Sequence, residues 1–139
     1  MSGYTQKNFS KSTEVRKFNH GTIELLDIGG GTVGRFVLQA GWKWSNDVKP
    51  LVKTEWCEAP HFQYQISGRY RIKMKDGTEF EIGPGDVTLI PPGHDAWVIG
   101  NEPARHRNRM DRRQNRHNPK ENLDADVFRR SPVGNRRPF

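Results

Sequence analysis

The clearest pattern in the chain is an alternation of side-chain character over residues 69–75 and 78–82. In the first run every even position is apolar and every odd position is basic, and the second run alternates again. A period of two is what a strand with one buried face requires. Asp76-Gly77, between the runs, is typical of a two-residue hairpin turn. The pattern predicts an antiparallel hairpin in which Phe80 and Ile82 face the core.

Shorter apolar runs on both sides of this hairpin predict further strands. They occupy residues 22–28 and 36–38 before the hairpin, and residues 87–90 and 96–99 after it. The run at 87–90 is rich in β-branched side chains and short enough for one buried strand. No convincing amphipathic helix pattern occurs before residue 103. Short strands separated by turn residues indicate an all-β fold, a small antiparallel β-barrel or sandwich.

Two sharp turns enclose the run at 87–90. Gly83-Pro84-Gly85-Asp86 precedes it, and Pro91-Pro92-Gly93-His94 follows it. Glycine accepts a positive φ without steric cost and proline fixes φ near −65°, so both segments favour tight turns. The second turn therefore delivers the imidazole of His94 to the beginning of a strand.

Charge divides the chain into two unequal parts. Residues 1–102 carry 12 basic and 12 acidic side chains, whereas residues 103–139 carry 11 basic and 4 acidic ones. The whole net charge of +7 therefore belongs to the C-terminal part, and the globular part gives no electrostatic reason to bind nucleic acid or an anionic membrane. We expect a loose N-terminal arm over residues 1–18, a barrel over 19–103 and a tail over 104–139.

The predicted tail is rich in arginine and almost free of apolar side chains. Such a segment cannot bury enough surface to offset the entropy of ordering, so we expect it to be disordered. Three interpretations remain open: a solvated end, an arginine-rich arm over residues 104–137 for RNA or acidic partners, or a shift of reading frame in the source gene. The last is motivated by the switch from lysine to arginine and by the lack of a further apolar strand.

Cysteine content and hydropathy suggest a cytoplasmic protein. Cys57 is the one cysteine in the sequence, so an internal disulfide is impossible and a reducing compartment fits best. The first residues are polar and lack the apolar region of a secretory signal. No apolar run approaches the length of a membrane span.

Residues 41–103 resemble the cupin superfamily, whose members are small antiparallel β-barrels. Gly85, Pro91 and Gly93 match the second cupin motif, G-x5-P-x-G, and Gly68 stands where the first motif ends in glycine. More narrowly, the segments Gly41-Trp42-Lys43-Trp44-Ser45, Val48-Lys49-Pro50, Ala59-Pro60-His61 and 91–97 are similar to those of single-domain bacterial cupins. The resemblance implies the fold and often a homodimer, and it is weak for activity because cupins host many chemistries.

The metal-binding positions depart from the usual cupin pattern, H-x-H-x3,4-E-x6-G. Counted back from the motif glycine, His61 takes the glutamate position, and Cys57 and Glu55 take the two histidine positions. In the second motif the usual histidine position holds Ala96. His94 lies two residues earlier, which keeps it on the same strand face.

Glu55, Cys57, His61 and His94 are therefore the candidate metal ligands. A carboxylate, a thiolate and two imidazoles together suit Zn²⁺ better than iron or nickel. Alternatively, Cys57 is a small buried apolar residue, Glu55 a surface carboxylate and His61 a hydrogen-bonded core residue.

Aromatic and amide side chains are candidates for a ligand pocket. Trp42, Trp44 and Tyr64 could line the mouth of a barrel, and Gln63 shares the parity of His61 and could orient a ligand. Tyr70 and Trp97 fit core packing better. We expect a cupin-like barrel that binds a small molecule through a divalent metal, with enzymatic activity left open. The alternatives are a metal-free ligand-binding or sensor barrel and nucleic-acid binding through the tail.

Overall fold

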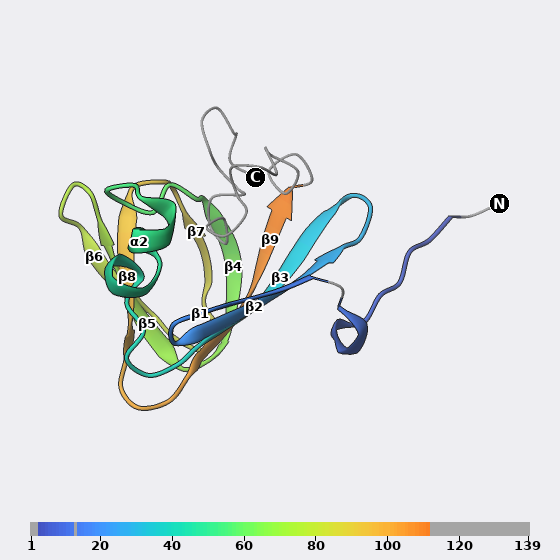
Figure 1. Ribbon diagram of the computed structural model, residues 1–139, viewed down its shortest axis with the longest axis horizontal. Helices are drawn as coiled ribbons and strands as arrows, with labels where there is room; N and C mark the ends of the chain where they lie inside the picture. The colour runs from blue at the N-terminus through green and yellow to red at the C-terminus, as the bar shows by residue number, and fades with distance from the viewer. Residues whose placement is uncertain (1–2, 13, 112–139) are drawn as a thin grey trace.

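The computed structural model describes residues 3–12 and 14–111, and these residues fold mainly into antiparallel strands (Figure 1). No helix in these ranges is long and apolar enough to cross a membrane. The strands are β1 (Glu14–Phe18), β2 (Gly21–Asp27), β3 (Gly31–Leu38), β4 (His61–Ser67), β5 (Arg69–Met74), β6 (Glu79–Ile82), β7 (Val87–Ile90), β8 (His94–Ile99) and β9 (Ala104–Asp111). Three single turns of helix accompany them: the 3-10 turn η1 (Phe9–Lys11), α1 (Trp44–Asp47) and α2 (Lys49–Val52).

The strands form two antiparallel sheets that face each other. One sheet has the order β1-β2-β3-β9-β4-β7, and the other has the order β6-β5-β8. The predicted hairpin is β5 paired with β6, with Tyr70 opposite Ile82 and Ile72 opposite Phe80. Figure 1 shows the smaller sheet with α1 and α2 beside it, while β1, β2, β3 and β9 form the opposite wall. The prediction of a small all-β barrel is confirmed.

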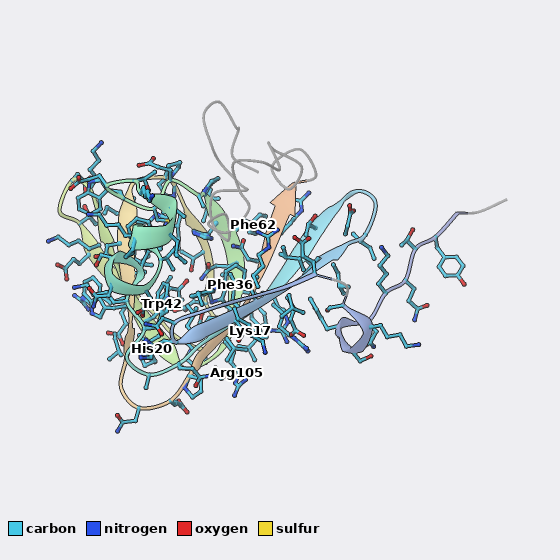
Figure 2. The ribbon with its side chains drawn as sticks, in the orientation of Figure 1. Lys17, His20, Phe36, Trp42, Phe62 and Arg105 are labelled. Carbon is cyan, nitrogen blue, oxygen red and sulfur yellow. The ribbon has the colours of Figure 1, made fainter. Side chains whose placement is uncertain are left out.

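The core lies between the two sheets and contains side chains from both. Its largest buried members include Ile23, Phe36 and Leu38 from the larger sheet, Ile72 and Ile82 from the smaller sheet, and Trp44 from α1. In Figure 2 side chains fill the space around Phe36 and Trp42, and the N-terminal arm extends away from the barrel. Tyr4 on this arm is 83% exposed, so the arm adds little to the core.

Two chain crossings between the sheets meet at Gly68. There β4 passes into β5, next to the connection from β8 to β9. Gly68 has φ = +74°, and a Cβ atom built on it would lie 2.0 Å from the carbonyl oxygen of Pro103. A side chain is excluded by both the backbone conformation and the close approach. The glycine that marked the end of the first cupin motif therefore closes a corner of the barrel.

The predicted domain boundaries are wrong at both ends of the barrel. Residues 14–18, assigned to the loose arm, form β1, and residues 104–111, assigned to the disordered tail, form β9 between β3 and β4. In β9 the residues Ala104, His106 and Asn108 are buried, while the intervening arginines point outward. A strand needs one face that can be buried, and small or neutral polar side chains suffice when neighbouring strands cover them. The part of the predicted tail over residues 112–139 lies outside the described residues.

The run at 87–90 forms the predicted strand β7, but it is not buried as a whole. Ile90 is fully buried, whereas Val87 is 66% exposed and Leu89 is 62% exposed. The reason is position: β7 is the last strand in the order of the larger sheet, and β4 is its one partner among the described strands. The apolar sequence of this run predicts that both faces of the strand are buried, whereas only one face is covered in the structure.

Candidate metal centre

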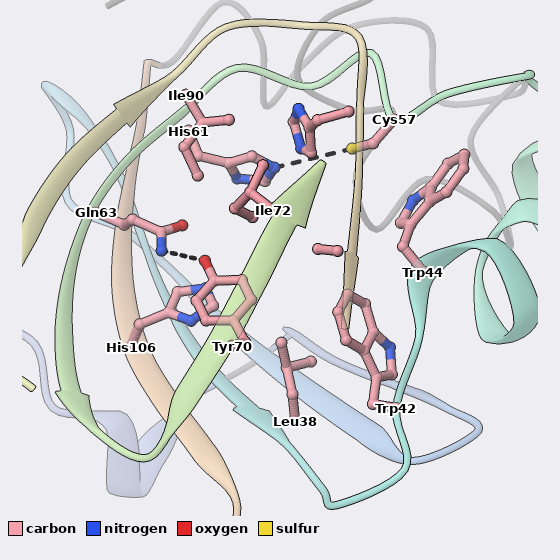
Figure 3. Close-up of a pocket in the computed structure, with 12 residues that line it drawn as sticks. Leu38, Trp42, Trp44, Cys57, His61, Gln63, Tyr70, Ile72, Ile90 and His106 are labelled. Carbon is pink, nitrogen blue, oxygen red and sulfur yellow. Dashed lines mark hydrogen bonds between the residues drawn. The ribbon is translucent and has the colours of Figure 1, made fainter. Parts of the chain in front are cut away.

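Three of the four predicted ligands converge inside the barrel. A sulfur or nitrogen atom from each of Cys57, His61 and His94 lies within 4.8 Å of the others. Their side chains are buried, with exposed fractions of 1%, 5% and 2%. Cys57 lies in the segment before β4, and the two histidines are the first residues of β4 and β8. Figure 3 shows Cys57 and His61 at one end of the cavity.

The backbone fixes Cys57 beside His94. The N–H of Cys57 donates to the carbonyl of His94 over 2.8 Å, and the N–H of Gly93 donates to the carbonyl of Cys57 over 2.8 Å. Gly93 has φ = +94°, a conformation that glycine adopts readily at the end of the Pro-Pro-Gly turn. The turn recognised in the sequence therefore brings an imidazole next to the thiol.

Each imidazole is held by a hydrogen bond at Nδ1. His94 Nδ1 lies 2.9 Å from the carbonyl oxygen of Pro91, and His61 Nδ1 lies 2.7 Å from the side-chain nitrogen of Asn108. On the other side of its ring, His61 Nε2 lies 3.9 Å from the Cys57 sulfur. The rings of His61 and His94 meet edge to face, with centroids 5.2 Å apart. The two side chains are thus oriented before any ligand enters.

Burial keeps this cluster uncharged in the protein without a metal. It lowers the pKa of His94 to about 4, although the hydrogen bond to Pro91 opposes the shift. Burial, together with the nearby His94, holds the pKa of His61 well below its usual value. Burial also raises the pKa of the Cys57 thiol, and the backbone N–H of Ala59 only partly opposes this. Near neutral pH, both imidazoles are therefore neutral and the thiol is protonated.

The donor set fits a divalent metal ion. One sulfur and two neutral imidazoles are the ligand types that Zn²⁺ takes in proteins, and three protein ligands leave a position for a further group. A metal-bound histidine commonly donates the N–H of its other ring nitrogen to an acceptor, and the carbonyl of Pro91 supplies such an acceptor for His94. A bound cation would also displace the thiol proton, because metal coordination deprotonates cysteine even where burial opposes it.

The cluster opens onto a small cavity in the barrel. The cavity leaves about 20 Å³ for the centre of a water-sized sphere. That space suits an ion and about one water molecule, since a single water needs roughly 10–15 Å³ on this measure. Trp42 and Trp44 lie on one side of it, and His61, Gln63 and His106 lie on the other (Figure 3). Its lining consists of Leu38, Trp42, Trp44, Cys57, His61, Gln63, Tyr70, Ile72, Ile90, His94, Ala96 and His106.

Sequence reasoning missed His106. Its ring lies between those of Phe36 and Tyr70, with centroid distances of 4.6 and 5.5 Å and nearly parallel planes. It was overlooked because it lies in the arginine-rich segment. The alternation of Ala104, His106 and Asn108 with arginines was the signal that could have placed it on a buried face.

Tyr70 belongs to the core, as its sequence context favoured, and it also lines the cavity. Its hydroxyl accepts a hydrogen bond from the side-chain nitrogen of Gln63 (Figure 3). Within the described part of the chain, three buried polar atoms of the lining have no hydrogen-bond partner: Gln63 Oε1, Trp44 Nε1 and His106 Nδ1. These atoms could bind a small polar ligand beside the cluster.

The remaining predicted site residues divide into two groups. Trp42, Trp44 and Gln63 line the cavity, as the sequence suggested. Tyr64 does not, because alternation along β4 turns it to the outer face, where it is 49% exposed. Glu55 is exposed in the segment before Cys57 and is not part of the cluster of donor atoms. Two-residue spacing places side chains on one face only in an extended strand, and the named strands begin again at His61.

Comparison with solved structures shows a similarity of fold. Neither a protein-family model nor a curated protein sequence matches the chain. Among solved structures, oxalate decarboxylase from Bacillus subtilis superposes with a TM-score of 0.55 at 16% identity, over 80% of this chain and 30% of that one. A cupin-2 domain protein from Rhodospirillum rubrum gives 0.56 at 15% identity, over 81% and 77%. The polyketide cyclase RemF from Streptomyces resistomycificus gives 0.51 at 17% identity, over 77% and 78%.

These similarities concern the fold. The chain spans less than a third of the length of the Bacillus subtilis oxalate decarboxylase, and identity is low throughout. What is shared is the fold, which is also what the two sequence motifs indicated. The protein has the cupin fold.

Proposed function

We propose that this cupin-fold protein binds a divalent metal ion, with zinc the best match, through Cys57, His61 and His94, and that the ion binds a small molecule in the cavity. The observation that carries the proposal is the convergence of three buried donor atoms within 4.8 Å. Burying polar side chains costs free energy unless their polar atoms find partners. A metal ion would coordinate all three of these side chains. With three protein ligands and an open position, such an ion would act as a Lewis acid or activate water.

The size of the cavity limits the ligand. About 20 Å³ leaves room for water or a ligand of a few atoms, whereas typical organic ligands occupy pockets of roughly 300–1,000 Å³. A larger substrate would require side chains of the cavity lining to move. The proposal also requires a reduced Cys57, which is consistent with a cytoplasmic location.

Metal analysis of the purified full-length chain tests the proposal. After depletion with a chelator and repletion with zinc, we expect about one ion per chain. Cys57→Ala and His61→Ala should each weaken zinc binding by more than about 100-fold, because each removes one of three ligands. Cobalt is a useful second probe, since a cobalt–thiolate bond gives a charge-transfer absorption band that Cys57→Ala would remove.

His20→Ala is the matched control for these variants. His20 lies outside the cavity, with its side chain 46% exposed and paired with Asp47. We expect wild-type zinc content in this variant. Absence of zinc from the repleted wild type, or equal zinc content in all four proteins, would contradict the proposal.

A metal-free ligand-binding barrel is the second candidate function. It is favoured by the buried polar atoms of Gln63, Trp44 and His106 that have no partner among the described residues. In this case a small polar ligand would raise the melting temperature of the protein equally with and without a chelator. A ligand-induced shift that disappears on chelation would favour the metal site instead.

A further inference from the structure

Asn108 connects the backbone of β4 to the imidazole of His61. Its side chain is 1% exposed. The backbone N–H of Phe62 donates to Asn108 Oδ1 over 3.2 Å, and Asn108 Nδ2 lies 2.7 Å from His61 Nδ1. The register of the two strands produces this contact, because Asn108 on β9 is opposite Gln63 on β4, inside the barrel. The amide therefore sits between a fixed backbone donor and a candidate metal ligand.

These two contacts determine which way the amide faces. A backbone N–H can only donate, so the atom of Asn108 that faces it must be the oxygen. The amide nitrogen, which can only donate, then faces His61 Nδ1. Turning the amide over would place its NH₂ group against the N–H of Phe62, two donors facing each other in a buried site.

The orientation of the amide determines the tautomer of His61. Since Asn108 donates to Nδ1, this nitrogen carries the lone pair, and the proton of the neutral ring is on Nε2, toward the Cys57 sulfur. His94 is held in the opposite form. Its Nδ1 faces the carbonyl of Pro91, which can only accept, so the proton is on Nδ1 and the lone pair on Nε2.

We propose that Asn108 is a positioning residue that holds His61 in the Nε2–H tautomer and thereby opposes metal binding at that nitrogen. The consequence for the metal rests on the function proposed above. For Nε2 to bind an ion, its proton must leave and Nδ1 must take one up, so the ring remains neutral. Nδ1–H then needs an acceptor, which Asn108 can supply only by turning its amide and losing the hydrogen bond from Phe62.

Asn108→Asp allows both hydrogen bonds, from the N–H of Phe62 and from Nδ1–H of His61, with almost no change in the shape of the side chain. Both carboxylate oxygens accept hydrogen bonds, so one can serve the N–H of Phe62 while the other serves Nδ1–H of His61. Carboxylates that accept from metal-bound histidines are worth about 10–100-fold in metal affinity in other proteins. We therefore expect Asn108→Asp to bind zinc at least about 10-fold more tightly than the wild type. Asn101→Asp, the same change at an exposed position between β8 and β9, is the control and should leave affinity unchanged.

Nitrogen-15 NMR of the histidine rings tests the tautomers directly, in the metal-free full-length chain and without reference to activity. We expect the Nε2–H form for His61 and the Nδ1–H form for His94, and a mixture at His61 in Asn108→Ala. On zinc addition, His61 should change to the Nδ1–H form. If His61 is already Nδ1–H without metal, or if Asn108→Ala leaves its tautomer unchanged, the role of Asn108 is refuted.

The two proposals fail in different ways. If the wild type binds no zinc, the proposed function and the zinc part of this inference both fall, while the NMR result still decides the tautomer. If zinc binds normally but Asn108→Asp binds it no better than Asn101→Asp does, only the positioning role falls. Where Asn108→Asp proves too unstable to study, the tautomer of His61 in Asn108→Ala decides the question.

Discussion

The larger sheet has two regions whose inner faces differ in chemistry. On β2 and β3 the inward side chains are mainly apolar, with Thr32 as a buried polar exception, and Ile23, Leu25, Phe36 and Leu38 are all at most 4% exposed. On β4 and β9 the inward side chains, apart from Ala104, are polar: His61, Gln63, Gln65, His106 and Asn108 are all at most 5% exposed. The outer face is inverted as well. Phe62, Tyr64 and Ile66 of β4 are 38–49% exposed beside the arginines of β9.

This difference separates the part of the sheet that stabilises the fold from the part that holds the site. Burial of apolar side chains is the main favourable term in folding. Buried amides and imidazoles contribute less, and Gln63 Oε1 and Gln65 Oε1 have no hydrogen-bond partner among the described residues. A region that breaks the rule of apolar interior and polar exterior is where function is expected to lie.

The largest expected effect is on the free energy of unfolding, when one buried side chain from each region is replaced. Phe36→Ala should lower the free energy of unfolding by about 3–5 kcal/mol, because it leaves a cavity in the apolar region. Gln65→Met keeps a similar volume and removes an unpartnered carbonyl oxygen, although it also loses the hydrogen bonds to the carbonyls of Ser67 and Gly68. For Gln65→Met we expect the free energy of unfolding to change by about 1 kcal/mol or less. Denaturant unfolding measures both, and equal losses would remove the energetic distinction between the regions.

The second expected effect is a loss of stability at low pH that is caused by the buried His106. Burial, with a smaller contribution from Arg107, lowers its pKa from 6.5 to about 3 in the folded protein. Below pH 6.5 the unfolded chain binds a proton at this histidine that the folded protein does not. Its contribution to stability is therefore complete above pH 6.5 and is lost progressively as the pH falls toward 3. Between pH 7.5 and 5 the loss is about 2 kcal/mol.

His106→Phe sharpens this prediction. A phenyl ring can keep the stack between Phe36 and Tyr70 but cannot bind a proton. In chelator-treated protein, the loss of unfolding free energy between pH 7.5 and 5 should be about 2 kcal/mol smaller in this variant than in the wild type. His61 and His94 remain in both proteins, so their own contributions cancel in the difference. The same pH dependence in both proteins would show that His106 does not titrate as its burial requires.

The sequence was sufficient for most of the fold because alternation and turn residues act locally. The hairpin of β5 and β6 and the bounds of β7 both follow from neighbouring residues. β9 could not be recognised by apolar content, since its buried face uses alanine, histidine and asparagine. Those side chains can be buried only because β3 and β4 cover them, and that is information about distant parts of the chain.

The site was predictable to a similar extent. Motif spacing led to Cys57 and His61, and the turn at 91–94 led to His94. Motif spacing also led to Glu55, which lies outside the cluster because residues 53–60 form no named strand. The contacts of Asn108 and His106 could not be predicted, because they depend on the pairing of β9 with β3 and β4. Nothing in the local sequence fixes that pairing.

The smallest expected effect on stability concerns the outer face. The exposed apolar side chains of β4 and β7 form one strip with Leu89 opposite Phe62 and Val87 opposite Tyr64, and β7 is an edge strand. Free edges and apolar strips favour pairing with a further strand. We propose that a second copy of the chain covers this strip, which would give the homodimer expected from the sequence.

Leu89→Lys tests the dimer with little effect on the fold. Because Leu89 is 62% exposed, we expect the free energy of unfolding of the monomer to change by less than about 0.5 kcal/mol. The dimer should dissociate at least about 10-fold more readily, since a charge would be buried in its interface. Val15→Lys introduces the same charge on β1, at the opposite edge of the same sheet, where Val15 is 47% exposed. Sedimentation over a range of concentrations should show weaker association for Leu89→Lys alone. A monomeric wild type, or equal association in the two variants, would mean that β7 is not where two copies meet.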